Sequence, residues 1–104
     1  MPPRAAATPD PGEAALSALA ALLRGRPGVE GAWLFGSRAR GDGGPRSDLD
    51  VAVLAPSMPP ASWHALLAEV EEGLPTLLAV DLVRLDDAPE ALRAEVARDG
   101  RRIA

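Results

Sequence analysis

The chain has 104 residues, of which 47% are apolar and 25% are charged, so it is long enough for a single small domain with one core. Its net charge of −4 argues against a large basic surface, and we expect no direct contact with nucleic acid. The sequence has no cysteine and a single histidine, which excludes disulfides, thiolate metal sites and zinc sites built on paired histidines.

The sequence carries no pattern of a membrane span or an export signal. No apolar run approaches the roughly 18 residues that cross a bilayer, and the N-terminus lacks a basic segment followed by an apolar one. Together with the cysteine content, these observations lead us to expect a cytoplasmic protein that does not associate with a membrane.

The N-terminal part of the chain predicts a flexible arm followed by a helix. Residues 1–9 are rich in proline and alanine, so the folded domain is expected to span residues 10–104. Asp10 can cap a helix in which Pro11 takes the first position. Apolar residues then recur at the spacing of one helix face: Leu16, Leu19, Ala20 and Leu23. The helix is expected to end before Pro27.

Two short apolar runs, residues 29–35 and 49–54, predict strands on either side of a glycine-rich loop. The loop, residues 36–46, contains four glycines and three arginines and has no hydrophobic periodicity. It leaves room for one helical turn directly after Gly36.

The C-terminal half predicts a helix over residues 60–74, a strand over residues 76–85 and a further short helix that Gly100 ends. Because the strand is almost entirely apolar, we expect it to be buried on both faces. Residues 101–104 predict a short edge strand. This order indicates an α/β (α+β) fold, with helices packed on a small sheet of three to four strands.

Two aspartates at the start of the second predicted strand are candidate metal ligands. Strand side chains alternate between faces, so Asp48 and Asp50 point the same way and repel each other. Mg²⁺ would relieve this repulsion, because it binds one or two carboxylates and completes its shell with water and phosphate oxygens. The alternative is a solvated strand start without a ligand.

A third aspartate, Asp81, stands in the middle of the apolar run that predicts the third strand. A buried carboxylate without a partner is costly, so this position requires a cation or an arginine. If the third strand lies beside the second, Asp81 completes the metal site; the alternative is a structural ion pair with Arg84 or with another arginine.

The loop after the first predicted strand can bind phosphate. Gly36 lets backbone amides approach an anion closely, and Ser37 adds a hydroxyl donor. Arg38, Arg40 and Arg46 place positive charge in this loop of an acidic protein, which suits a triphosphate. The alternative for each arginine is a solvated loop charge.

These features resemble a known family. Gly-Ser at 36–37, ten further residues and Asp-Leu-Asp at 48–50 resemble the signature of the minimal nucleotidyltransferases of the DNA polymerase beta superfamily. Asp81 resembles the third carboxylate of that family. The string GSRARG…SDLDVAV is similar to the antitoxin members of HEPN/MNT toxin–antitoxin pairs. The likeness covers residues 16–103 and implies the minimal nucleotidyltransferase fold.

The resemblance implies roles for the candidate residues. ATP would be the substrate, two Mg²⁺ ions would be the cofactors, and AMP would be transferred. Asp48 and Asp50 would bind both metals. Asp81 would bind one of them and help to deprotonate the acceptor hydroxyl. The β- and γ-phosphates would lie against Gly36 and Ser37.

In the antitoxin branch, the resemblance implies that AMP is transferred to a tyrosine of a HEPN ribonuclease toxin, which is thereby silenced, and that the two proteins form a hetero-oligomer. Two alternatives stay open. The chain could neutralise its toxin by binding alone, or it could be a nucleotidyltransferase that acts on a small molecule. The complete set of three carboxylates argues against the first alternative.

Overall fold

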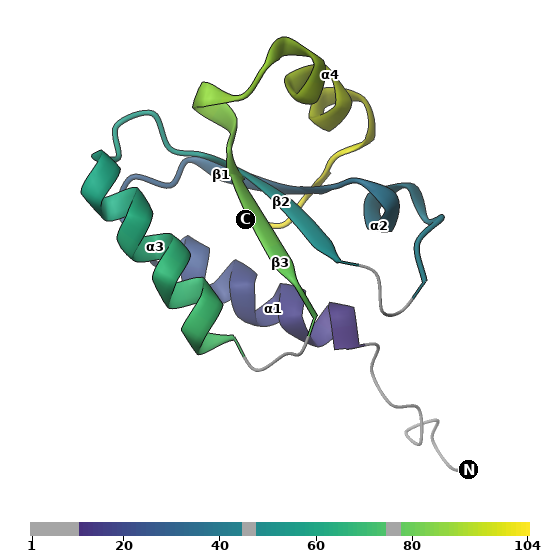
Figure 1. The fold of residues 1–104 in the computed structure, drawn as a ribbon, viewed down its shortest axis with the longest axis horizontal. Helices are drawn as coiled ribbons and strands as arrows, with labels where there is room; N and C mark the ends of the chain where they lie inside the picture. The colour runs from purple at the N-terminus through teal and green to yellow at the C-terminus, as the bar shows by residue number, and fades with distance from the viewer. Residues whose placement is uncertain (1–10, 45–47, 75–77) are drawn as a thin grey trace.

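The structure, a computed structural model, describes residues 11–44, 48–74 and 78–104. The predicted N-terminal arm, the Asp10 cap and Arg46 lie outside the described residues. The described chain forms a four-stranded mixed sheet with helices on both faces, which confirms the expected α/β fold (Figure 1).

The elements follow one another in the predicted order. Their bounds are α1 (Pro11–Arg24), β1 (Gly31–Phe35), α2 (Ser37–Arg40), β2 (Leu49–Leu54), α3 (Pro60–Gly73), β3 (Val80–Arg84), the 3₁₀ helix η2 (Leu85–Asp87), α4 (Glu90–Asp99) and β4 (Arg101–Arg102). The strand order is β3-β2-β1-β4, with β2 and β3 parallel and the other pairs antiparallel. Among the described helices, none is both long and apolar enough to cross a membrane.

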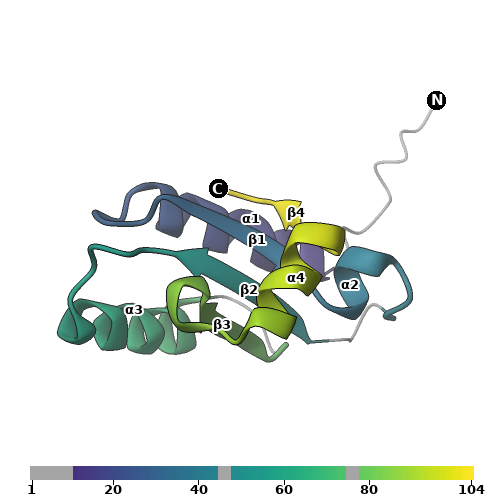
Figure 2. The ribbon, with the colours of Figure 1, turned by 90° about the horizontal axis from the view of Figure 1, so that it is seen from above.

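Helices α1 and α3 cover one face of the sheet (Figures 1 and 2). The predicted stripe of α1 is buried there, with Leu19 and Leu23 fully enclosed. The face that they cover consists of alternate strand residues: Ala32, Leu34, Leu49, Val51, Val53, Val80 and Leu82. Alternation along the strands therefore sends the other residues, including the even-numbered ones of β2, to the opposite face.

Helix α4 packs on that opposite face and covers only part of it. Its buried residue Val96 lies in a second, smaller apolar cluster with Phe35 of β1 and Ala52 of β2. Gly100 ends the helix as predicted, and its N–H donates a hydrogen bond to the carbonyl of Val96 at 2.8 Å. Beyond this cluster the same face of the sheet continues into polar residues.

The expectation that the third strand is buried on both faces is wrong. β3 lies at the edge of the sheet and pairs only with β2, so its residues are partly or fully exposed. It begins at Val80, whereas the apolar pattern predicted a start at residue 76. The apolar run reflects packing of Val80 and Leu82 against α3, while Asp81 between them is exposed.

Arg84 at the end of β3 secures the connection between β2 and α3. Its Nη2 donates hydrogen bonds to the carbonyls of Ala55 and Met58 at 2.6 and 2.5 Å. Its Nε lies 3.4 Å from Asp86, which accepts a hydrogen bond from the N–H of Ala55. Arg84 therefore binds the loop carbonyls and Asp86 rather than Asp81. The alternative of an Asp81–Arg84 ion pair is wrong.

Arg84→Met removes these charge-assisted hydrogen bonds and the guanidinium itself, whose carbon lies 5.7 Å from the ring centroid of Trp63. Because the arginine side chain is only 14% exposed, the loop carbonyls lose partners that water cannot fully replace. We expect unfolding free energy to fall by about 2 kcal/mol, measured by thermal and urea denaturation. Arg98→Met is the control: it breaks a pair in which the arginine is 67% exposed, so stability should stay close to wild type. Equal stability of the two variants would contradict the prediction.

Candidate active site

Two aspartates from neighbouring strands lie side by side on the α4 side of the sheet. In the parallel register of β2 and β3, Asp50 is directly opposite Asp81. On its other side Asp50 is opposite Phe35 of β1, whose side chain packs in the α4-side cluster. Because directly paired residues share a face, both carboxylates belong to this face. The predicted neighbourhood of the second and third strands is confirmed.

The environment of Asp50 is crowded with negative charge. Partial burial raises the pKa of its carboxyl, and the charges of Asp81, Asp48 and Glu95 raise it further, in that order. Asp48 comes directly before β2 and is exposed, and Asp81 is exposed as well, whereas Asp50 is half-buried. The site is therefore an open acidic surface with Asp50 at its centre.

Gly36 closes the β1 side of this surface. It follows β1 directly and adopts a φ of 79°, a left-handed conformation that disfavours any residue with a side chain. A Cβ at this position would lie 2.5 Å from Oδ2 of Asp50. Two independent constraints thus favour glycine here, and the second shows that the backbone of Gly36 lies against the carboxylate of Asp50.

Ser37 begins α2, the single helical turn that the sequence allowed after Gly36. The carbonyl of Gly36 accepts hydrogen bonds from the N–H groups of Ala39 and Arg40, both at 3.1 Å. The turn ends at Gly41, whose N–H donates to the carbonyl of Ser37 at 3.0 Å. The half-buried Ser37 is thereby fixed one residue from the glycine that touches Asp50.

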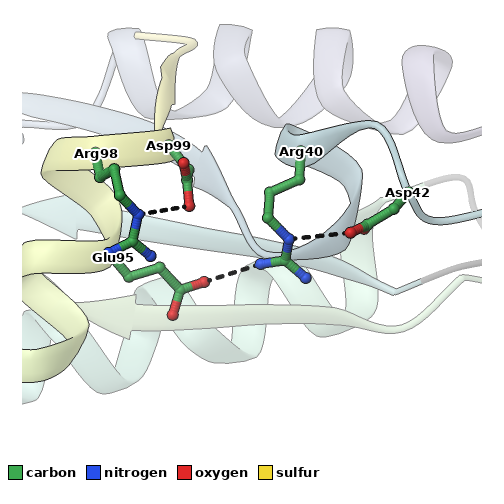
Figure 3. A network of polar contacts seen from close by, with 5 residues as sticks. All are labelled: Arg40, Asp42, Glu95, Arg98 and Asp99. Carbon is green, nitrogen blue, oxygen red and sulfur yellow. Dashed lines mark hydrogen bonds and ion pairs between the residues drawn. The ribbon is translucent and has the colours of Figure 1, made fainter.

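The structure separates the two arginines of α2 that were predicted to bind phosphate. The half-buried guanidinium of Arg38 packs against Gly12 in the first turn of α1, where a Cβ would collide with it. Arg40 instead points toward α4 (Figure 3). Its Nε lies 3.2 Å from Asp42, and its Nη1 lies 3.4 Å from Glu95. Arg40 is therefore the arginine on the side of the carboxylates.

Glu95 is a site residue that the sequence did not indicate. It comes from α4, contacts Arg40 and contributes to the charge around Asp50. Within the helix it looks like part of a solvated charged face, because Arg93, Arg98 and Asp99 surround it in the sequence.

The donor set fits a hard divalent cation bound together with phosphate. Within residues 11–44, 48–74 and 78–104, no group of three or more acidic or histidine side chains is arranged to hold a metal ion. Mg²⁺ does not need such a cluster, because it takes one or two carboxylates and fills its shell with water and phosphate oxygens. The negative charges around Asp50 repel one another and would attract a cation. Asp48, Asp50 and Asp81 are the carboxylates that would hold Mg²⁺ here.

A comparison with protein families gives one match. Residues 17–104 match the family described as polymerase beta, nucleotidyltransferase, and this range contains Gly36, Ser37 and all three aspartates. No curated protein matches the chain.

Several solved structures resemble this one. A chain of a toxin–antitoxin complex with AMP-PNP is 27% identical, with a TM-score of 0.65 over 85% of this chain and 72% of that one. A mutant of the MntA–HpeT toxin–antitoxin pair is 31% identical, with a TM-score of 0.63 over 81% and 67% of the two chains. A chain from the complex of a tri-AMPylated Shewanella oneidensis HEPN toxin with MNT antitoxin is 25% identical, with a TM-score of 0.60 over 86% of this chain and 69% of that one.

Gly36→Ala should destabilise the protein more than the same change at Gly41. Both glycines have positive φ, 79° and 84°, so both substitutions strain the backbone. Only at Gly36 does the new methyl group meet Asp50, since a Cβ at Gly41 has no neighbour within 4 Å. We expect the free energy of unfolding to fall by about 1–2 kcal/mol for Gly41→Ala and by clearly more for Gly36→Ala, measured by urea denaturation. Equal losses would show that the contact with Asp50 is not significant.

Asp50→Asn should raise the melting temperature of the metal-free protein at neutral pH. The pKa of Asp50 is raised in the folded state, so the charged carboxylate opposes folding at any pH above that pKa. The difference in melting temperature between Asp50→Asn and wild type should shrink as the pH falls through the pKa of Asp50 in the folded protein toward the ordinary pKa of aspartate. The wild-type carboxyl takes up its proton over this range and is then neutral like asparagine. Melting curves across this pH range in EDTA test it; a variant less stable than wild type at pH 7 would contradict the assignment.

Proposed function

Because the chain belongs to the polymerase beta nucleotidyltransferase family, we propose that it is an antitoxin that acts by AMP transfer. It transfers AMP from ATP to the hydroxyl group of a tyrosine on a HEPN ribonuclease toxin. One observation carries the proposal: Asp50 lies between Gly36 and Asp81 on an open face of the sheet. The solved relatives support the partner, because they are toxin–antitoxin complexes, one of them with a tri-AMPylated HEPN toxin.

In the proposed reaction the acceptor oxygen attacks the α-phosphorus of ATP. A new bond forms between that oxygen and phosphorus, the bond from the α-phosphorus to the bridging oxygen breaks, and pyrophosphate leaves. Mg²⁺, when bound, neutralises the phosphate charge and stabilises the leaving group. Asp81 takes the proton of the acceptor hydroxyl, for which it is suited by its exposed position beside Asp50.

The remaining residues bind and orient the nucleotide. Gly36 exposes the backbone at the start of α2, where the phosphates can approach closely, and Ser37 offers a hydroxyl donor. Asp48 and Asp50 would hold the two Mg²⁺ ions that accompany the triphosphate, and Asp81 would hold one of them. Arg40 adds a positive charge beside these carboxylates, and Asp81 lies at the sheet edge, where a protein acceptor can reach it.

The test combines the purified chain with a purified HEPN ribonuclease toxin, labelled ATP and Mg²⁺. We expect AMP on a toxin tyrosine, mapped by mass spectrometry, and loss of ribonuclease activity. Asp48→Asn/Asp50→Asn should reduce transfer by at least 100-fold, as should EDTA. The chain has no tyrosine of its own, so a tyrosine label must come from the partner.

The same experiment distinguishes catalysis from simple binding. A toxin that is silenced equally well by the Asp48→Asn/Asp50→Asn protein, and without a label, would contradict the proposed transfer and show that the antitoxin acts by occlusion. Transfer to a small hydroxyl compound but not to the toxin would contradict the proposed acceptor.

A further inference from the structure

Arg40 is held by two carboxylates from different parts of the chain. Asp42, two residues away, contacts Nε, and Glu95 on α4 contacts Nη1 (Figure 3). The Arg40 side chain is 42% exposed, and within the described parts of the chain these contacts use Nε and Nη1. The second terminal nitrogen, Nη2, can therefore take an oxygen of a ligand.

The pair of Arg40 and Glu95 lies beside the carboxylate face. Helix α4 packs on the same side of the sheet as Asp50 and Asp81, and Figure 2 shows α2 next to it. The negative charge of Glu95 also raises the pKa of Asp50. The side chain of Glu95 is 29% exposed, so its contact with Arg40 is partly shielded from water.

A carboxylate at this position needs an explanation. The phosphates of ATP are negatively charged, so a further negative charge near Asp50 weakens their binding when it acts alone. The contact with Arg40 offers a compensating role, because an arginine binds phosphate well only when its planar guanidinium is correctly oriented.

We propose that Glu95 is a positioning residue: it holds the guanidinium of Arg40 beside the carboxylate face, in the orientation that binds the phosphates of ATP. This inference rests on the proposed function and deepens it. It assigns to α4, which carries none of the residues of the family signature, control over the affinity for nucleotide.

The test is whether Glu95→Gln weakens or strengthens the binding of ATP. If Glu95 acted only through its charge, its removal would strengthen binding of an anionic nucleotide. If Glu95 positions Arg40, its removal weakens binding, and we expect the Kd for ATP with Mg²⁺ to rise about fivefold by calorimetry. In the transfer assay KM for ATP should rise while kcat stays close to wild type.

A double-mutant cycle shows whether Glu95 acts through Arg40. Arg40→Gln alone should weaken ATP binding about tenfold or more. In the Arg40→Gln background, Glu95→Gln should cause no further loss, or should restore some affinity. An equal loss in both backgrounds, or a Glu95→Gln protein that binds ATP as tightly as wild type or more tightly, overturns the proposal.

Two further variants complete the test. Glu95→Asp keeps the charge but shortens the side chain by one methylene group, so it should also weaken ATP binding; if Glu95→Gln does not fold, wild-type affinity of this variant overturns the proposal. Glu69→Gln is the matched control. It breaks the ion pair between Arg26, which follows α1, and Glu69 of α3, the helix on the other face of the sheet, and it should leave ATP affinity unchanged.

The outcomes also separate the inference from the proposed function. A wild-type protein that binds no ATP overturns both. A wild-type protein that binds ATP, with Glu95→Gln binding equally well, overturns the role of Glu95 alone.

Discussion

The repulsion among carboxylates on one face of the sheet is the constraint on which the site depends. Partial burial, and then the charges of Asp81, Asp48 and Glu95, raise the pKa of the Asp50 carboxyl. The rest of the fold resists this repulsion. Asp50 and Asp81 stay adjacent because their strands are hydrogen-bonded in parallel register, above a core formed by α1 and α3.

One face of the sheet forms the main apolar core, and the other face carries the candidate active site. The face under α1 and α3 carries most of the buried apolar residues, among them Leu34, Val51 and Val53. The other face has a small cluster around Val96 and then opens into the carboxylates. Because one helix covers only part of this face, the acidic residues remain accessible without any loss of the main core.

How far the sequence predicts this structure depends on the sequence separation of the contacts. Alternation along a strand places Asp48 and Asp50 together, and the Gly-Ser pair marks the turn after β1, because these relations are local. The exposure of Asp81 was not predictable, since an apolar run does not reveal whether its strand is central or at an edge. The contact between Arg40 and Glu95 spans 55 residues and depends on how α4 crosses the sheet.

The central position of β2 has a consequence for the dynamics of the site. β2 pairs with β1 over residues 50–54 and with β3 over residues 49–53, and Leu49, Val51, Ala52 and Val53 are fully buried. Amide hydrogens of such a strand exchange with solvent only when the whole domain opens, whereas those of α2, a turn of four residues, exchange through local opening. We therefore expect Asp50 to move only with the global fold, whereas Ser37 fluctuates with α2 on the shorter timescale of a surface turn.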